Sequence, residues 1–269
     1  MALTAAQDRG FEINEKELKR HGRFIVRFLD LNREKYLIGK GQGGQVDTAG
    51  YALLALKAAE VKPSDTTAAV AEYLLQRNSD TDHWVTNSKR PPSEASQFTT
   101  TYVGLRGLQS FGTPDQQERI EHRTATVRDW LTKTVAIDHE DRVFRLRGLK
   151  TAGAAAGDIE SAVGDLVSTQ REDGAWAQLD DMDTDAYATA TALVALHEAG
   201  GMATADPVYQ RGLRHLLNTQ VEDGSWHVVT RSRPFQTYFE TGFPHGADQF
   251  ISCAASGWAT MALLLACEP

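Results

Sequence analysis

One motif occurs twice in this sequence, at an interval of fifty residues. Residues 165–176 are DLVSTQREDGAW, and residues 211–226 are RGLRHLLNTQVEDGSW. In both copies an apolar helical pattern ends at a glutamine, and an Asp-Gly turn then leads to a tryptophan. Self-similarity at a fixed period indicates a chain built from repeated structural units. The fold therefore depends on the structure of one unit and on the number of units in the chain.

The pattern around both copies is helical. Apolar residues recur at helical spacing and the period-two alternation of strands is almost absent, so the chain is predicted to be all-α. The helices come in pairs, in which an amphipathic outer helix precedes an inner helix rich in Ala and Leu. We expect five pairs, at residues 15–31 and 47–60, 64–76 and 94–110, 114–134 and 140–152, 158–170 and 185–200, and 207–220 and 248–266.

The units differ in regularity, and they are expected to stack. Gln76 and Trp84 resemble a degenerate copy of the motif, whereas the third unit lacks a Gly-x-Trp. One unit cannot bury its own apolar face, so either an open solenoid or a closed ring is expected. The nearly uncharged last helix, ISCAASGWATMALLLA, must be covered on most of its surface. Packing against the first unit would cover it, which favours a closed ring in one domain, residues 1–269.

Composition narrows the classes of function. The chain is 41% apolar with a net charge of -8, which argues against a nucleic-acid partner because phosphate binding needs clustered Lys and Arg. The basic residues 142, 145, 147 and 150 have helical spacing and are interpreted as a solvated face. Two cysteines favour a reduced cytoplasmic location. No apolar run is long enough to span a membrane, no signal peptide is present, and no amphipathic apolar plateau is visible.

The N-terminus has an unusual pattern. Met1 to Ala6 resembles the interior of a helix, because good helix formers stand there with no capping residue before them. This pattern predicts that the chain is a fragment of a longer protein, or that it starts downstream of the true domain edge.

The repeated motif resembles a known sequence family. Arg211-Gly212, Gln220 and Gly224-Ser225-Trp226 are similar to the QW repeat of triterpene cyclases, which the squalene-cyclase and prenyltransferase repeat superfamily shares. Residues 234–266 resemble the closing segment of bacterial squalene-cyclase-like repeat proteins. The resemblance implies an α/α toroid of about five helix pairs, in which each glutamine clamps the next repeat and stacks with the tryptophan. It also implies a polyprenyl or triterpenoid ligand in a central cavity, without a cofactor.

The same resemblance suggests where an acid would stand. Class II terpene cyclases protonate an alkene with an Asp-x-Asp-Asp motif at the start of an inner helix. Here Asp180, Asp181, Asp183 and Asp185 cluster at such a start, but the motif is broken because Thr184 takes one of its positions. If the cluster is catalytic, we expect Asp183 to be the acid and Asp185 its partner, since crowded carboxylates raise one pKa. The alternative is an N-cap with acids that complement the helix dipole.

Further candidates lie where the other inner helices begin and in the loop before the last helix. The loop group has an alternative interpretation, in which the loop tucks its aromatic side chains under itself. A zinc site is not predicted, because the chain has no Asp-x-Cys pair and the spacing of His245, Asp248 and Cys253 does not place them on one helical face. The expected substrate-binding residues are Tyr51, Phe98, Tyr102, Tyr187, Tyr238, Phe239, Phe243, His245 and Asp248, with Asp47, Gln97 and Gln249 nearby.

Two functions from different classes follow. The first is a terpenoid-cyclase-like enzyme that binds a polyprenyl or triterpenoid substrate and starts a cyclisation or isomerisation with an acid. The second is a non-catalytic repeat module that binds an apolar ligand or a protein partner. The broken acid motif favours the second, and so does the length, because triterpene cyclases carry two such domains.

Overall fold

The computed structural model describes residues 1–234 and 237–267, and these residues form an all-α fold, as predicted. Within this part of the chain there is no β-strand, only two isolated bridges, Arg90–Glu94 and Ala177–Thr184. The α-helices are α1 (Ala2–Asp8), α2 (Glu15–Asp30), α3 (Arg33–Leu37), α4 (Gln45–Ala58), α5 (Asp65–Gln76), α6 (Gln97–Phe111), α7 (Gln117–Lys133), α8 (His139–Thr151), α9 (Ala156–Val167), α10 (Ala186–Glu198), α11 (Pro207–Thr219) and α12 (Gln249–Ala266), with 3₁₀ turns η1 (Pro114–Gln116) and η2 (Gly246–Asp248).

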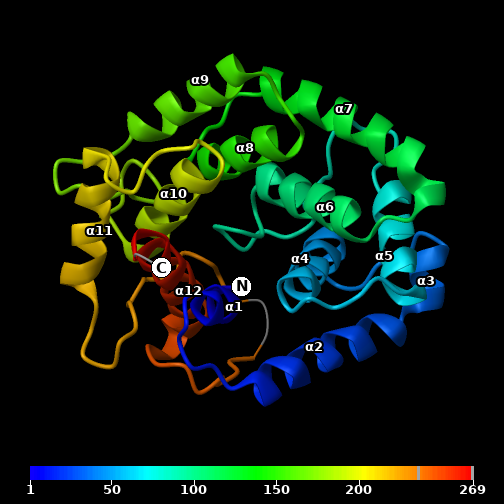
Figure 1. Cartoon of the computed structure of the whole chain (residues 1–269), viewed down its shortest axis with the longest axis horizontal. Coiled ribbons are helices and arrows are strands. Elements are labelled where there is room, and N and C mark those ends of the chain that lie inside the picture. The colour runs from blue at the N-terminus through cyan, green and yellow to red at the C-terminus, as the bar shows by residue number, and fades with distance from the viewer. Residues whose placement is uncertain (235–236, 268–269) are drawn as a thin grey trace.

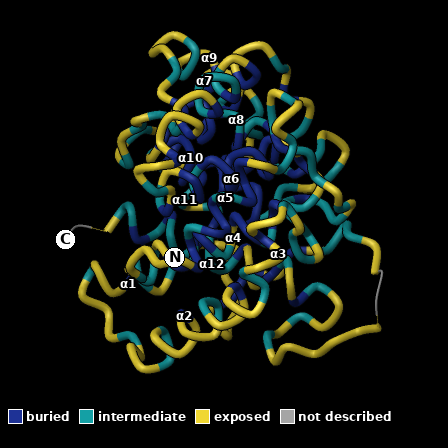
Figure 2. The backbone as a smooth tube through the Cα atoms, turned by 90° about the vertical axis from the view of Figure 1, so that its right-hand side faces the viewer, coloured by how far each residue is buried: buried dark blue, intermediate teal, exposed yellow. Residues whose placement is uncertain are grey.

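The helices lie in two curved layers (Figure 1). Helices α4, α6, α8, α10 and α12 form the inner layer, and each contacts the next one in that order. Helices α2, α5, α7, α9 and α11 lie outside them, so the five expected pairs are present as α2/α4 to α11/α12. Figure 2 shows that the buried residues concentrate along the inner helices, while α1 and α2 are largely exposed.

Local sequence explains where these helices start and how closely they pack. Ser64 caps α5 through a reciprocal capping box with Thr67, and Pro207 follows the cap Asp206 at the first position of α11. Helix α10 is buried continuously from Ala186 to Leu196, where its small side chains allow the neighbouring helices to approach.

Two details of the first unit differ from the expectation. Helix α4 starts at Gln45, two residues before the expected start at Asp47, and follows Gly44 with φ +76°. The Asp47 side chain is buried and accepts a hydrogen bond from Thr100. The short helix α3 was not expected; its buried Tyr36 donates a hydrogen bond to Gln42 in the following glycine-rich loop.

Each tryptophan of the motif joins the two helices of its own unit. The indole N–H of Trp176 donates to the carbonyl of Leu166 on α9 at 2.9 Å, and its backbone N–H donates to Thr189 Oγ1 on α10 at 3.1 Å. Trp226 donates its indole N–H to Leu216 on α11 at 2.8 Å. Both rings are almost completely buried, so these donors would be costly to leave unpaired.

The second and third units contain the same joint in altered form. Trp84 donates its indole N–H to Leu74 at 2.9 Å, which confirms that this segment is a degenerate copy of the motif. In the third unit the Arg145 guanidinium takes this role, because its Nε donates to the carbonyl of Leu131 near the end of α7 at 2.9 Å. A polar joint between the outer and inner helix therefore exists in four of the five units.

The glutamine of the motif reaches the next unit. Gln170 Nε2 donates to the carbonyl of Val208 on α11 at 2.9 Å and to that of Gly174 at 2.8 Å. The Trp176 ring also packs on α11, where a Cβ at Gly212 would lie only 3.1 Å from it. The glycine beside Arg211 in the motif is thus explained by the close approach of a tryptophan from the preceding unit.

The outer helix of the first pair, α2, carries both buried and exposed apolar residues. The apolar residues of α2 do not all face the core, because Leu29 is fully buried whereas Phe24 is 69% exposed. The last-turn carbonyls of Phe28 and Leu29 accept hydrogen bonds from the adjacent Asn32. Helix α2 therefore presents part of its apolar surface outwards.

Helix α12 is the last helix of the inner layer, and the first pair, α2 and α4, is not among its main contacts. It packs on α10, on α11 and on the N-terminal helix α1, whose neighbour Arg9 donates to the carbonyl of Cys267. Within the described residues, η2 and α12 form the one helical segment long and apolar enough to cross a membrane. In the fold it is an inner helix with buried Ala255, Ala259 and Ala262.

Candidate functional site

The first turns of the inner helices bring buried carboxylates and hydroxyls together. Thr100 Oγ1 on α6 donates to Asp47 Oδ1 on α4 at 2.6 Å. The adjacent Thr99 Oγ1 donates to Glu140 Oε1 on α8 at 2.8 Å, and Tyr187 Oη on α10 donates to Glu140 Oε2 at 3.0 Å. The N-terminal ends of four inner helices are therefore linked by one polar cluster.

Glu140 is the most buried carboxyl of this cluster, with 1% of its surface exposed. Burial raises its pKa to about 7, and the hydrogen bonds from Thr99 and Tyr187 only partly oppose this rise. Near neutral pH the side chain thus exists in both protonation states. When Glu140 is protonated, its O–H becomes a donor, while its carbonyl oxygen can still accept from a neighbouring hydroxyl.

Tyr51 stands beside this cluster. Burial, together with the charges of Glu140 and Asp47, raises the pKa of Tyr51 well above its ordinary value. The side chain nevertheless has 36% of its surface accessible. Tyr51 therefore stands where the buried carboxyls come near the protein surface. Burial also raises the pKa of Asp47, to about 6.

A second polar layer lies deeper along α8. Arg147 follows Glu140 by seven residues, which corresponds to about 10 Å along the helix axis. Its Nη2 donates to Tyr102 Oη at 2.9 Å and pairs with Glu198 at 3.1 Å, and its guanidinium lies 5.2 Å from the Trp258 ring centre. Its side chain is only 6% exposed, so the prediction that this residue belongs to a solvated face is wrong.

The expected acidic pair does not join this cluster. Asp183 lies on an exposed turn before α10. Asp185 caps α10, because its carboxylate accepts from the backbone N–H of Ala188 at 2.8 Å and from Gln178 at 2.9 Å. Burial raises the pKa of Asp185, and these hydrogen bonds oppose the rise. Asp185 thus has the geometry of the alternative interpretation, an N-cap.

The aromatic residues expected at the inner helices lie in two different environments, the polar interior and the contact with the outer helices. Tyr187 and Tyr102 belong to the two polar layers, bonded to Glu140 and Arg147. Phe98 is directed to the outer layer, where its ring centre lies 4.6 Å from that of Trp130 on α7. Phe98 therefore helps to attach α7 rather than to line the interior.

The loop before α12 brings histidines and acids together at its own base. His245 lies 2.7 Å from Ser225 Oγ and stacks on His227 with 4.8 Å between ring centres. Asp248 Oδ2 lies 2.8 Å from His227 Nε2, and its other oxygen accepts from the backbone N–H of Thr230. These contacts join the loop to the turn that carries Trp226.

The aromatic side chains of this loop are not tucked beneath it. Tyr238 and Phe239 are 57% and 64% exposed, and Phe243 lies against His245 with 6.3 Å between ring centres. The structure therefore keeps these three residues apart from the cluster around Glu140.

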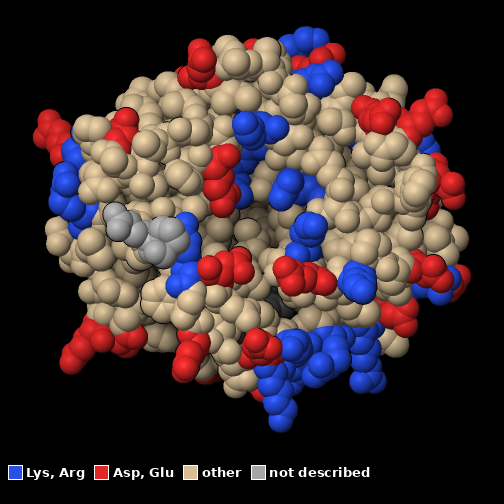
Figure 3. All heavy atoms as spheres, in the orientation of Figure 1, with Lys and Arg blue, Asp and Glu red and all other residues tan. Residues whose placement is uncertain are grey.

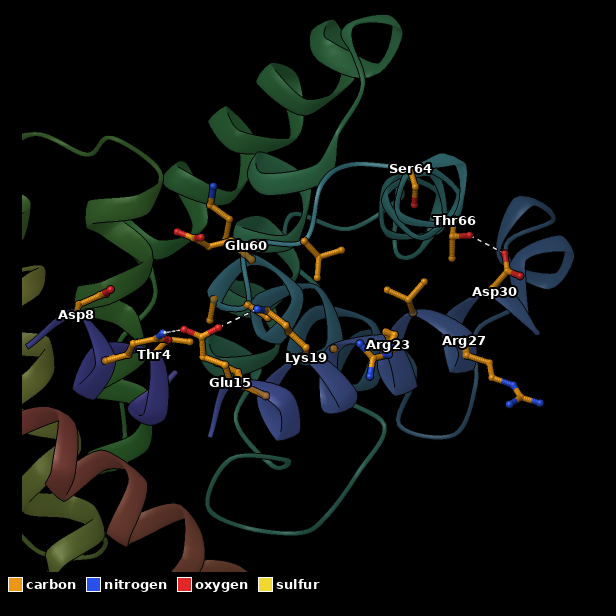
Figure 4. Close-up of a pocket in the computed structure, with 18 residues that line it drawn as sticks. Thr4, Asp8, Glu15, Lys19, Arg23, Arg27, Asp30, Glu60, Ser64 and Thr66 are labelled. Carbon is orange, nitrogen blue, oxygen red and sulfur yellow. Dashed lines mark hydrogen bonds and ion pairs between the residues drawn. The ribbon is translucent and has the colours of Figure 1, made fainter. Parts of the chain in front are cut away.

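A separate cleft of about 1150 Å³ lies between α1, α2 and the turn from α4 to α5 (Figure 4). Lys19 and Glu15 form an ion pair of 2.8 Å at its wall, and Thr66 donates to Asp30 at 2.7 Å. Acidic and basic side chains are balanced in its lining, which suits a polar ligand better than a hydrocarbon chain. The charged lining residues are Asp8, Glu15, Lys19, Arg23, Arg27, Asp30, Lys57 and Glu60.

No protein-family model and no curated protein matches the sequence. The resemblance to terpenoid cyclases thus depends on the motif residues themselves. Within the described residues, no three His, Cys, Asp or Glu side chains converge as metal ligands would. The site that the geometry supports is the polar interior around Glu140, which the sequence did not single out.

Proposed function

We propose that this chain is a terpenoid-cyclase-like α/α toroid that holds a polyprenyl or triterpenoid molecule inside its inner layer. The alternation of outer and inner helices and the repeated joints at Trp84, Trp176 and Trp226 support the fold assignment. In this proposal Glu140 exchanges a proton with the ligand, in place of the exposed Asp183.

The observation that carries the proposal is the environment of Glu140. A general acid or base works best when its pKa lies near the operating pH, and burial raises the pKa of Glu140 to about 7. The carboxyl is shielded from water, so a reactive intermediate would not be quenched. Tyr51 and Tyr187 stand beside it, and an aromatic face stabilises a neighbouring cation.

The expected reaction is a proton-transfer isomerisation. Protonated Glu140 would give its proton to one carbon of an alkene, and the alkene π electrons would form the new C–H bond. The carboxylate would then take a proton from a carbon next to the resulting cation, and the electrons of that C–H bond would form a double bond at a new position. The fixed charge of Arg147, about 10 Å deeper, would repel a carbocation, so the reaction is expected at the Glu140 end.

The test is incubation of the protein with squalene and with polyprenyl diphosphates, followed by mass spectrometry of the products. Glu140→Gln keeps the shape of the side chain and is expected to lower the rate by about 10²–10⁴-fold, the usual contribution of a general acid. Asp183→Asn is the matched control and should retain activity. A Glu140→Gln variant as active as the original protein would exclude the acid assignment.

A second function is favoured by one feature of the same cluster. Glu140 is bonded to hydroxyls from two neighbouring helices, which is also how a purely structural carboxyl is held. The alternative is therefore a non-catalytic repeat module that binds an apolar ligand or a protein. Purified protein that forms no product but retains an extractable lipid would favour ligand binding, and the absence of both would favour a protein partner.

A further inference from the structure

The outward face of α2 presents large apolar side chains to solvent. Phe24 is 69% exposed, Phe28 39% and Leu31, directly after the helix, 75%. These positions are four and three residues apart, so they form one stripe along the helix. A single exposed apolar residue needs no explanation, but a continuous stripe on a surface helix marks an interaction site.

Two more exposed apolar residues follow α2 in the sequence. Leu37 and Ile38, at the end of α3, are 41% and 64% exposed. On the opposite side of α2, Gly22 and Leu29 are buried against the rest of the fold. Helix α2 is therefore apolar on two sides, and the fold covers only one of them.

A row of cations runs beside the stripe. Lys16, Arg20, Arg23 and Arg27 follow one another at helical spacing and lie next to the apolar positions on the helix surface. Arg20 forms an exposed ion pair of 2.6 Å with Glu17, which contributes little attraction of its own. Figure 3 shows Lys and Arg gathered over α2.

The charge of this segment is opposite to that of the whole protein. Residues 15–40 contain eight Lys and Arg against four Asp and Glu, whereas the complete chain has 28 against 36. The combination of protruding aromatic side chains and flanking cations is that of helices that lie in the interface of an anionic bilayer. An outer helix at the edge of the molecule, as in Figure 1, can reach such a surface without rearrangement of the fold.

We propose that α2 docks this protein onto a bilayer that contains anionic lipids. Phe24, Phe28 and Leu31 enter the boundary between headgroups and acyl chains, and Lys16, Arg20, Arg23 and Arg27 lie at the lipid phosphates. This surface is separate from the interior around Glu140, and the proposal does not depend on the ligand bound there. It adds a membrane contact that the sequence pattern did not predict.

The test is flotation of the purified protein with vesicles of phosphatidylcholine, with and without phosphatidylserine. We expect binding only when phosphatidylserine is present, and weaker binding in high salt because exposed charges are screened. Arg23→Glu with Arg27→Glu should lower the affinity at least 25-fold, since each cation near an anionic surface contributes about fivefold. Phe24→Ser with Leu31→Ser should lower it at least about tenfold, through loss of buried apolar area.

The matched control is Val135→Ser with Ile137→Ser. These two residues are 78% and 80% exposed, and they lie in the turn between α7 and α8 and not on α2. The control should bind vesicles as well as the original protein, and all variants should keep their helical circular dichroism. Absence of binding to phosphatidylserine vesicles, or equal binding by Phe24→Ser with Leu31→Ser, would overturn the proposal. So would an oligomer that these substitutions disperse, because the stripe would then cover a second copy.

Discussion

The fourth and the first pair of helices differ in how the outer helix is held against the inner helix. In the fourth pair, Trp176 donates to both of its helices and its ring is fully buried. In the first pair, no tryptophan is present and the aromatic Phe24 of α2 is 69% exposed. A repeat unit in this fold is thus held rigidly where a polar joint fixes its two helices. A unit without that joint retains apolar surface for another role.

The largest difference between the two regions is expected from removal of their aromatic side chains. Trp176→Ala should lower the free energy of unfolding by about 3–5 kcal/mol, because it creates a cavity and removes the indole hydrogen bond to Leu166. Phe24→Ala should change it by less than about 0.5 kcal/mol, as for other exposed positions. Urea unfolding measures both. Equal effects would show that α2 is packed more closely than the structure indicates.

A carboxyl in the interior, on α8 of the third pair, and a carboxyl on α2 of the first pair should respond differently to pH. Because burial raises the pKa of Glu140 from 4.5 to about 7, the folded state binds its proton more tightly than the unfolded state. The stability that this group contributes is present below pH 4.5 and is lost, by about 3 kcal/mol, as the pH rises to about 7.

Glu140→Gln removes this loss, so its unfolding free energy should fall less than that of the original protein between pH 4.5 and pH 7.5. Glu15→Gln on α2 is the control, because Glu15 is exposed and the nearby Lys19 lowers its pKa. Urea unfolding at several pH values gives both curves. Parallel curves for Glu140→Gln and the original protein would contradict the raised pKa.

A smaller difference should separate the two glycines of the motif. Gly174 and Gly224 have φ values of +84° and +83°, so alanine is strained at both and should cost about 1–2 kcal/mol. A Cβ at Gly174 would also lie 2.7 Å from Arg211 Cβ, whereas the nearest atom at Gly224 is 3.9 Å away. Gly174→Ala should therefore destabilise the protein by about 1–3 kcal/mol more than Gly224→Ala. Thermal and urea unfolding would show whether the close approach of Arg211 to Gly174 adds to the backbone strain of the positive φ.

Structural features that depend on residues close together in the chain could be predicted from the sequence. The helix pairs follow from periodicity, and the joints at Trp176 and Trp226 follow from a motif whose indole bonds reach back only ten residues. The orientation of α2 was not predictable in this way, because its apolar residues occupy a wide arc and the pattern does not say which part the fold covers. Phe24 and Leu29 accordingly ended on opposite sides.

The interior cluster could not be predicted for a different reason. Charged side chains are normally exposed, so Glu140 and Arg147 in a helix with many charges indicate a surface. Their burial depends on partners from other helices, Thr99 41 residues before Glu140 and Tyr187 47 residues after it. Asp183 and Asp185 attracted the prediction because they stand at the start of an inner helix, and this is also the position of an N-cap.

The joint at each tryptophan has a consequence for how units of this kind can diverge. The backbone N–H of the tryptophan bonds to a hydroxyl of the inner helix 17 residues later in the second unit, 13 in the fourth and 30 in the fifth. The same bond between the tryptophan and the inner helix is thus made across connections of very different length. Each doubling of a flexible loop costs only about 0.6 kcal/mol in closure entropy. Insertions after the tryptophan can therefore give one unit a new surface while the helices of every unit keep their places.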